Sequence, residues 1–393
     1  KRILGLGFWL FAVSTHFSFL SPNVHWLLLF RGLQGLGGGM IFGTGMAILT
    51  SVFPPQNRGR VLGLAVSAVY IGLSTGPFAG GLLTHYFGWR SLFLVISIFG
   101  LIPLLLLMVF LKGEWADAAG EHFDVTGAVM YVPSLVGIIY GFSILPQLSG
   151  VVLLVGGTIG FAAFVVRQKN LEEPLLQVNL YIKNRAFALS NAAALIHYSA
   201  TFGLMFLLSL YLQYIHGLDS RMTGIVLIAQ PIMMALFSPI AGRISDKVEP
   251  RIISSIGMAI TAAGLFYFAF IGTQTSLLAI VLVLLILGFG FALFSSPNMN
   301  AIMGSVERKY LGIASGSAGT MRVLGQMFSM GIATLMLSIF VGGRAISEEI
   351  FPHLLQSIRW TFGVFTFLCI VGMFASLARG TIHSGETASE NAQ

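Results

Sequence analysis

Twelve long apolar runs dominate this chain, and each is close to the length that crosses a membrane as a helix. The hydrocarbon core of a bilayer takes about 20 apolar helical residues to span. The runs are continuous and rich in Leu, Ile, Phe and Gly, whereas barrel strands are short and alternate in polarity. The predicted spans are residues 3–20, 24–50, 60–84, 91–111, 124–145, 150–166, 187–214, 222–242, 252–272, 277–296, 310–340 and 357–378.

Composition indicates the same class of protein. Hydrophobic residues make up 56% of the 393 residues and charged residues only 9%, and the mean hydropathy is +0.89. A soluble core does not hide so much apolar sequence. We therefore expect an all-α polytopic membrane protein with about 12 transmembrane helices, whose even number places both termini on one side.

Lys and Arg are distributed unevenly between the two sides. Loops on the side of the termini hold 15 of them and loops on the opposite side hold 4. Cytoplasmic loops collect these residues, so both termini are predicted to be cytoplasmic. The net charge of +7 follows from this topology, and no nucleic-acid partner is expected. The single cysteine, Cys369, excludes an intramolecular disulfide and a cysteine-based metal cluster.

The third span contains a row of small residues beside a proline, at Gly72, Gly76, Pro77, Gly80 and Gly81. Glycines four residues apart share a helix face and let another helix approach closely. The proline removes one backbone hydrogen bond and bends the helix. This pattern predicts tight packing against another part of the molecule, which could be a plain helix contact.

The second span carries a charged residue inside the membrane. Arg31 lies seven residues from the outer end, about 10 Å deep, and shares a face with Gln34. A guanidinium at this depth should face protein or water rather than lipid. From its depth alone it would bond backbone carbonyls between helices or extend outward to the interface. Gly35, Gly39 and Gly43 form a further row for close helix packing.

An internal repeat appears at an offset of 249 residues. Residues 60–65 (Arg-Val-Leu-Gly-Leu-Ala) match residues 309–314 (Lys-Tyr-Leu-Gly-Ile-Ala), and Gly76 matches Gly325. Both copies run outward from the cytoplasm. Parallel repeats of this kind relate two helix bundles with a substrate site near the membrane midplane between them.

These motifs resemble those of the fourteen-helix drug:proton antiporters of the major facilitator superfamily. The Gly-Pro motif resembles that family's fifth-helix G-x-x-x-G-P-x-x-G-G signature, and Arg31 with Gln34 resembles its fourth-helix R-x-x-Q-G motif. The loop motif formed by Gly242, Arg243, Asp246, Lys247 and Arg251 resembles the second-half copy of its G-x-x-x-D-R/K loop, although Glu249 and Pro250 depart from the pattern.

The resemblance implies a domain organisation in which the first two helices are missing. Residues 1–111 would form an incomplete N-terminal bundle of four spans, and residues 112–186 a cytoplasmic linker with two extra helices, 124–145 and 150–166. Residues 187–379 would form a six-helix C-terminal bundle, and residues 380–393 a cytoplasmic tail. It also implies that Asp246 belongs to a charge network that locks one conformation; a solvated turn residue near the next helix is the alternative.

Several polar residues lie inside the predicted spans. Arg322 is about 18 Å deep in the eleventh span, where it should line a cavity or pair with a polar group. His197 lies near the midplane and either titrates near neutral pH or serves as an interhelical donor. The candidates for proton coupling are Arg31, Gln34, His197 and Arg322. The candidates for the substrate cavity are Asn191, Tyr198, Gln230, Asn298 and Gln326, although Asn298 and Asn300 after Pro297 more often signal a helix end.

All fourteen acidic residues fall in loops or at span ends. A multivalent cation would want a buried carboxylate, so a neutral, amphipathic or anionic substrate fits better. By resemblance, an acidic proton site would lie in the absent first helix. No Gly-Lys-Ser/Thr phosphate loop and no catalytic constellation is present, so an enzyme, a cofactor and a bound metal are not expected.

The sequence therefore predicts a secondary transporter in the cell membrane that exports apolar or amphipathic small molecules in exchange for protons. It is expected to act as a monomer within the lipid bilayer. Two alternatives remain open: a transporter of one endogenous metabolite with the same fold, and a non-transporting sensor, scaffold or inactive fragment.

Overall fold

The computed structural model describes residues 1–114, 122–342 and 348–380, apart from the side chains of Pro77 and Phe78. These described residues form helices and turns without any strand. Eleven of the helical segments are long and apolar enough to cross a membrane. The predicted all-α polytopic fold is confirmed.

The first half of the chain forms six helices close to the predicted spans. Asn23 begins the second of them, because its side chain accepts hydrogen bonds from the backbone N–H groups of His25 and Trp26. The third helix starts with Pro55, whose fixed backbone angle suits the first turn. The helices are α1 (Arg2–Phe19), α2 (Val24–Val52), α3 (Pro55–Phe87), α4 (Arg90–Phe110), α5 (Val125–Ser143) and α6 (Leu148–Lys169).

The second half differs from the predicted spans in three places. The seventh and eighth spans are each broken into shorter helices, and a short helix, α7, lies in a predicted loop. The tenth span continues past Pro297 to Gly304 instead of ending near residue 296. The elements are α7 (Val178–Lys183), α8 (Arg185–Thr201), α9 (Leu204–Leu210), η1 (Tyr211–Ile215), α10 (Ser220–Leu227), α11 (Ala229–Ser245), α12 (Pro250–Ala269), α13 (Leu277–Gly304), η2 (Arg308–Tyr310), α14 (Leu311–Val341), η3 (Glu348–Ile350) and α15 (Phe351–Ala378).

Both breaks have a local cause. Between α8 and α9 the backbone N–H of Gly203 donates to the Ser329 hydroxyl of α14 at 2.8 Å. A side chain that inserts into the backbone ladder in this way interrupts a helix. Between α10 and α11, Pro231 has no N–H to offer to the preceding turn.

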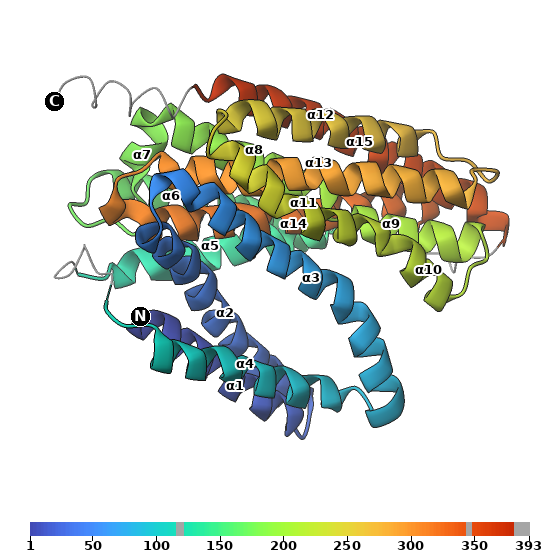
Figure 1. Ribbon diagram of the computed structural model, residues 1–393. Coiled ribbons are helices and arrows are strands. Elements are labelled where there is room, and N and C mark those ends of the chain that lie inside the picture. Colours follow the sequence, from blue (N-terminus) through green and yellow to red (C-terminus); the bar gives the residue numbers. More distant parts are fainter. Residues whose placement is uncertain (115–121, 343–347, 381–393) are drawn as a thin grey trace.

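The helices run alternately between two sides of the molecule. We call the side on which α1 begins and α15 ends the terminal side, and the opposite side the distal side. In Figure 1, α1, α2 and α4 form one group and α8 to α15 another, and α3 begins beside α11 on the terminal side and ends near α4. Helix α3 therefore links the two groups.

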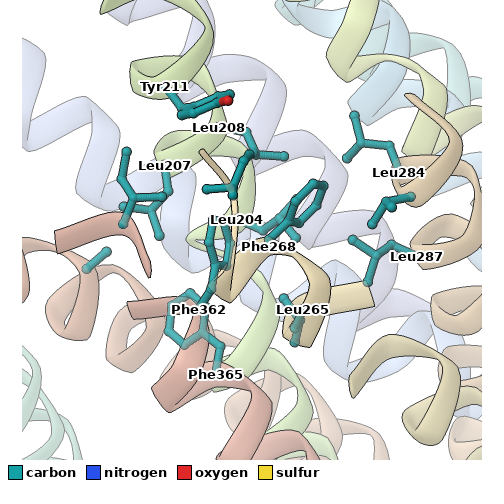
Figure 2. Close-up of a cluster of buried hydrophobic side chains, with 14 of the residues drawn as sticks. Leu204, Leu207, Leu208, Tyr211, Leu265, Phe268, Leu284, Leu287, Phe362 and Phe365 are labelled. Carbon is teal, nitrogen blue, oxygen red and sulfur yellow. The ribbon is translucent and has the colours of Figure 1, made fainter. Parts of the chain in front are cut away.

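The group formed by α8 to α15 has a continuous apolar core (Figure 2). Leucine and phenylalanine side chains from α9, α12, α13 and α15 meet there, and Tyr211 of η1 closes one end. The fully buried members shown are Leu204, Leu207, Leu208, Tyr211, Leu265, Phe268, Leu284, Leu287, Phe362 and Phe365. In a bilayer these contacts hold the helices together by close van der Waals packing, because lipid tails are as apolar as the side chains.

In the other group, one pair of glycines brings α1 and α2 together. A Cβ at Gly37 would lie 2.7 Å from the backbone nitrogen of Phe11, and one at Gly7 would lie 2.8 Å from the Cβ of Met40. The sequence predicted this role for the row at Gly35, Gly39 and Gly43. That prediction was wrong, because a Cβ at any of the three would meet no described atom within 4 Å.

Helices α5 and α6 form a hairpin fastened at its terminal end by Asp124. Its carboxylate accepts from the N–H of Gly127 at 2.8 Å, from Arg167 Nη1 at 2.7 Å and from Gln168 Nε2 at 2.6 Å. The Arg167 guanidinium, followed by these other donors, holds the pKa of the Asp124 carboxyl well below its usual range. Asp124 therefore stays ionised and ties the two helices together.

Candidate functional site

The terminal halves of α3 and α11 form a tight seam. A Cβ at Gly63 would lie 2.5 Å from the Ser238 carbonyl oxygen and 2.9 Å from the Cα of Pro239. One turn earlier, Gly59 of α3 faces Gly242 of α11 in the same way. Backbones this close leave no room for a side chain, so the glycines are what permits the contact.

Asp246 fastens the seam from the end of α11. Its two carboxylate oxygens accept from the backbone N–H groups of Gly59 at 2.6 Å and of Arg60 at 3.0 Å. Hydrogen bonds to an ionised acceptor are about twice as strong as neutral ones. The solvated-turn alternative for Asp246 was therefore wrong, and the helix that it binds is α3 rather than the helix that follows it.

The loop motif contributes to the seam unevenly. Gly242 and Asp246 lie in the contact, Arg243 and Lys247 are exposed, and Arg251 is half-buried at the start of α12. The Ser296 hydroxyl of α13 reaches the Gly59 carbonyl oxygen at 3.5 Å. The seam thus involves α3, α11 and α13.

A cavity of about 50 Å³ lies between the two helix groups, next to the seam. It is smaller than the sites that hold drug-sized ligands, about 300–1,000 Å³, and has room for water. Its walls come from α2, α3, α8, α13 and α14. The lining residues are Phe42, Met46, Val66, Val69, Tyr70, Ala194, Tyr198, Phe294, Ser295, Asn298, Met299, Ile302, Ser315, Ala318, Gly319 and Arg322.

Arg322 is the one charged residue among these lining residues. Its guanidinium carbon lies 5.7 Å from the ring centroid of Tyr198 and 5.8 Å from that of Phe42. A cation over an aromatic face is attracted by the electrons of the ring. The two rings come from different helix groups, so Arg322 of α14 lies where the groups meet. This placement agrees with the depth argument made from the sequence.

Two polar groups on α3 make contacts across the interface that the sequence did not single out. The Tyr70 hydroxyl and the Ser295 hydroxyl of α13 are 2.6 Å apart. Ser67 donates to the Ala235 carbonyl oxygen of α11 at 2.5 Å. Both residues lie on the α3 face that carries Gly59 and Gly63, and this helical spacing was the only signal that could have identified them.

The candidates Arg31 and Gln34 are in contact, as their spacing predicted. Arg31 Nη1 donates to Gln34 Oε1 at 2.5 Å, and Gln34 Nε2 donates to Thr15 Oγ1 of α1 at 2.6 Å. Gln34 is buried and Arg31 is exposed. The three side chains form a short hydrogen-bonded chain between α2 and α1.

His197 occupies an aromatic pocket rather than a polar one. The imidazole stacks on Phe294 with the ring centroids 3.9 Å apart, and it meets the edge of Phe291 at 4.8 Å. It is fully buried, and neither ring nitrogen has a hydrogen-bond partner in the described part of the chain. The expectation of an interhelical donor was therefore wrong. His197 does not lie among the cavity residues, although its neighbour Tyr198 does.

The Gly-Pro motif lies in the distal half of α3. A Cβ at Gly72, Gly76 or Gly81 would meet no described atom within 4 Å, and one at Gly80 would lie 3.6 Å from Leu92 Cδ2. The predicted close packing of this row is absent from the described surroundings in this conformation. The side chain of Pro77 lies outside the described residues.

The remaining cavity candidates lie in different places. Asn298 lines the cavity, and its Oδ1 accepts from Arg379 Nη1 at 2.7 Å. Since α13 continues through it, the helix-end interpretation was wrong. Asn191 and Gln230 are buried outside the cavity, and Gln326 is half-buried and also outside it. Of the five candidates, only Tyr198 and Asn298 line the cavity.

Within residues 1–114, 122–342 and 348–380 there is no group of three or more His, Cys, Asp or Glu that could hold a metal ion. The arrangement described above offers a closely packed interface along α3 and a cavity lined by one arginine and several aromatic side chains.

Known proteins resemble this chain over most of its length. It is 28% identical to the riboflavin transporter RibZ of Clostridioides difficile over 355 residues, which cover 90% of the chain and 76% of RibZ. It is 26% identical to the multidrug resistance protein Stp of Mycobacterium tuberculosis over 372 residues, 91% of the chain and 68% of Stp. The fold matches the crystal structure of the human organic anion transporter MFSD10 with a TM-score of 0.68 at 15% identity, over 95% of the chain and 76% of that protein.

A family model gives the classification. The model described as Major Facilitator Superfamily matches residues 1–124 and 191–392, which is most of the chain. The residues that it leaves out include all of α5 and α6, the hairpin held by Asp124. The chain is thus a multi-pass membrane protein and belongs to the Major Facilitator Superfamily.

Proposed function

We propose that this protein exports apolar or amphipathic small molecules across the cell membrane by alternating access, driven by proton entry. The terminal side would be cytoplasmic, since its loops carry most of the Lys and Arg. The structure would then represent a state that is closed toward the cytoplasm. The protein would act as a monomer within the bilayer.

One observation carries this proposal: the seam along α3 occupies only half of the helix. The terminal half is locked to α11 through Gly59, Gly63 and Asp246, whereas the Gly-Pro motif in the distal half has no close partner among the described residues. A transporter that alternates needs one closed end and one end free to close. We expect the Gly-Pro motif to form the second seam, when the first one opens.

Proton coupling is assigned to the hydrogen-bonded chain of Arg31, Gln34 and Thr15. It is polar, it joins two helices, and its exposed member, Arg31, can exchange partners with water. His197 is a weaker candidate, because its aromatic pocket offers no partner to a charged imidazole. Similarity to the tetracenomycin C resistance and export protein of Streptomyces glaucescens supports export as the direction of transport.

Flux measurements in proteoliposomes test the proposal. With an imposed pH gradient, the wild-type chain should move an amphipathic dye, and Arg31→Ala should abolish the gradient-driven part while the protein stays folded. Arg221→Ala is the matched control, because it also removes an arginine, from an exposed position at the start of α10, and it should leave flux unchanged. Unchanged flux in Arg31→Ala would remove Arg31 from the mechanism.

A second candidate function is transport of one endogenous metabolite. The similarity to a riboflavin transporter favours it. A competition panel separates the two: weak competition by many unrelated compounds supports export of many drugs, whereas one tight competitor among metabolites supports the alternative.

A further inference from the structure

The one charged side chain among the described residues that line the cavity is a cation, Arg322, and the aromatic rings of Phe42 and Tyr198 lie near it. These features limit the compounds that the cavity can bind. We propose that it selects planar aromatic compounds that carry an anionic group, with Arg322 as the residue that binds the anion. The inference rests on the proposed transport function, because it names the substrate class of the same cavity.

The first observation is that two aromatic rings lie near the Arg322 guanidinium. The ring centroids of Tyr198 of α8 and Phe42 of α2 are 5.7 Å and 5.8 Å from the guanidinium carbon. A contact with an aromatic face leaves the N–H donors in the guanidinium plane available. These donors can bind a carboxylate, sulfonate or phosphate in the plane of the group while the rings contact a flat ligand.

The second observation is that Arg322 has no partner of its own. It makes no hydrogen bond and no ion pair with any residue in the described ranges, and its side chain is half-buried. Its neighbours in the cavity wall include Met46, Val69 and Ala318, which supply no acceptor side chain. A lone cation inside a membrane span is costly unless an acceptor or water compensates for it. A bound anion would provide that compensation.

The third observation is that most of the other polar side chains of the cavity are already engaged, including Ser315, which donates to the Phe42 carbonyl oxygen at 2.9 Å. The Tyr70 and Ser295 hydroxyls bond each other at 2.6 Å. Asn298 accepts from Arg379 at 2.7 Å and donates to the Ser190 carbonyl oxygen at 3.1 Å. Arg322 is therefore the strongest available donor. No acidic side chain lines the cavity in the described structure, so a cationic ligand would meet only like charge.

The small volume of the cavity favours a thin, flat ligand. At about 50 Å³ the space does not hold an aromatic compound in this conformation. It would have to widen as α2 moves away from α8 and α14, which separates Phe42 from Arg322. A flat ligand needs the least widening and can take over the ring contact that Phe42 gives up.

Two dyes with the same xanthene ring and opposite charge test this inference. Fluorescein is an anion at pH 8, and rhodamine 123, whose carboxyl group is esterified, is a cation; the binding of both to the purified full chain can be followed by fluorescence polarisation. We expect the Kd of fluorescein to be at least tenfold lower than that of rhodamine 123. Arg322→Gln should remove this preference, and Arg322→Lys should keep the preference with a weaker affinity, since the charge stays and the planar fork is lost.

Arg221→Gln is the control, because it removes the same charge from an exposed position at the start of α10 and should change neither Kd. Equal Kd values in the wild type, a preference that survives in Arg322→Gln, or no binding of either dye would overturn the inference. Dye flux in proteoliposomes is measured separately. Flux without an Arg322-dependent preference would leave the transport proposal standing, whereas selective binding without flux would contradict transport and leave an anion-binding cavity.

Discussion

The two halves of α3 show how one helix can serve two opposite tasks. In the terminal half, Gly59 and Gly63 bring the backbone of α3 against that of α11, and Asp246 fastens it with two charge-assisted hydrogen bonds. In the distal half, Gly72 and Gly76 are just as small, yet no described atom lies within 4 Å of the place where their Cβ would be. Small residues therefore permit close contact, but other groups decide which half makes it.

The difference also separates the large apolar core of the molecule from the interface that we propose to open. The core of α8 to α15 buries large apolar side chains on all sides (Figure 2). The interface along α3 combines glycine contacts and a few hydrogen bonds, each of which contributes about 1 kcal/mol, with two smaller apolar clusters around Leu62 and Tyr70. An interface of this kind can open without unfolding the core.

The largest expected effect comes from filling the closed half. Gly63→Leu would place a side chain where a Cβ already lies 2.5 Å from the Ser238 carbonyl oxygen. Overpacking costs about 3 kcal/mol or more, so the closed seam should lose at least 100-fold in population and flux should fall accordingly. Flux in proteoliposomes and fluorescence-monitored thermal unfolding in detergent would show a folded but inactive protein.

Gly76→Leu is the matched variant in the open half. It should leave the terminal seam intact and instead prevent the proposed closure on the distal side, so flux also falls while the conformation described above becomes the dominant one. If Gly76→Leu transported normally, the distal half would have no part in the cycle.

A smaller effect is expected when the hydrogen bonds between Asp246 and α3 are weakened. Asp246→Asn removes the charge but keeps one acceptor, and the closed seam should weaken by about 1–2 kcal/mol, or roughly tenfold in population. Labelling of a cysteine placed near Gly59 by a water-soluble maleimide should become correspondingly faster. Asp219→Asn, which changes a similar carboxylate at the start of α10, should not alter that rate. Equal acceleration in both variants would contradict a specific role for Asp246.

Tyr70 lies near the boundary between the two halves of α3, and the loss of its hydroxyl should weaken the closed seam less than the changes above. Tyr70→Phe removes only the hydroxyl that meets Ser295, for a change of about 1 kcal/mol in the closed seam. The same labelling assay should show an acceleration of about fivefold. A rate as high as that of Gly63→Leu would mean that the boundary, not the glycine contact, controls opening.

The α5–α6 hairpin is a reference region, because the account of the two halves of α3 does not involve it. Because the pKa of Asp124 is lowered in the folded protein, its bonds stabilise the hairpin above the ordinary carboxyl pKa of 3.8 and lose that effect as pH falls through the lowered value. Asp124→Asn should therefore lower the Tm at neutral pH, and the difference from wild type should shrink below about pH 4. Glu307→Gln, in an exposed pair with Lys309, should not change the Tm measurably.

The sequence predicted most of the helices because long apolar runs have few alternatives in a membrane. It did not predict the break at Gly203, since that depends on the hydroxyl of Ser329, 126 residues away. Nor did it predict the end of α13, because Pro297 is accommodated within a helix that other helices surround.

The sequence identified a residue of the candidate site most directly where a charged side chain lies inside a span, because burying a charge there is costly. Arg322 could be placed near a cavity because a charge inside a span needs a reason. The glycine row of α2 was assigned to the wrong contact, because a small residue indicates that a helix can approach but not where it does. Tyr70 and Ser295 are ordinary side chains whose role appears only when α3 and α13 are seen together.

Two distances, one on each side of the membrane, test alternating access along α3 most directly. Spin labels at Arg60 and Lys247 would report on the terminal side, and labels at Tyr86 and Met222 on the distal side; all four side chains are exposed, and the native Cys369 is buried. When substrate and a proton gradient are supplied in proteoliposomes, we expect a second population in which the terminal distance is longer and the distal distance is shorter. Distances that lengthen together, or that do not change while dye is transported, would contradict the account.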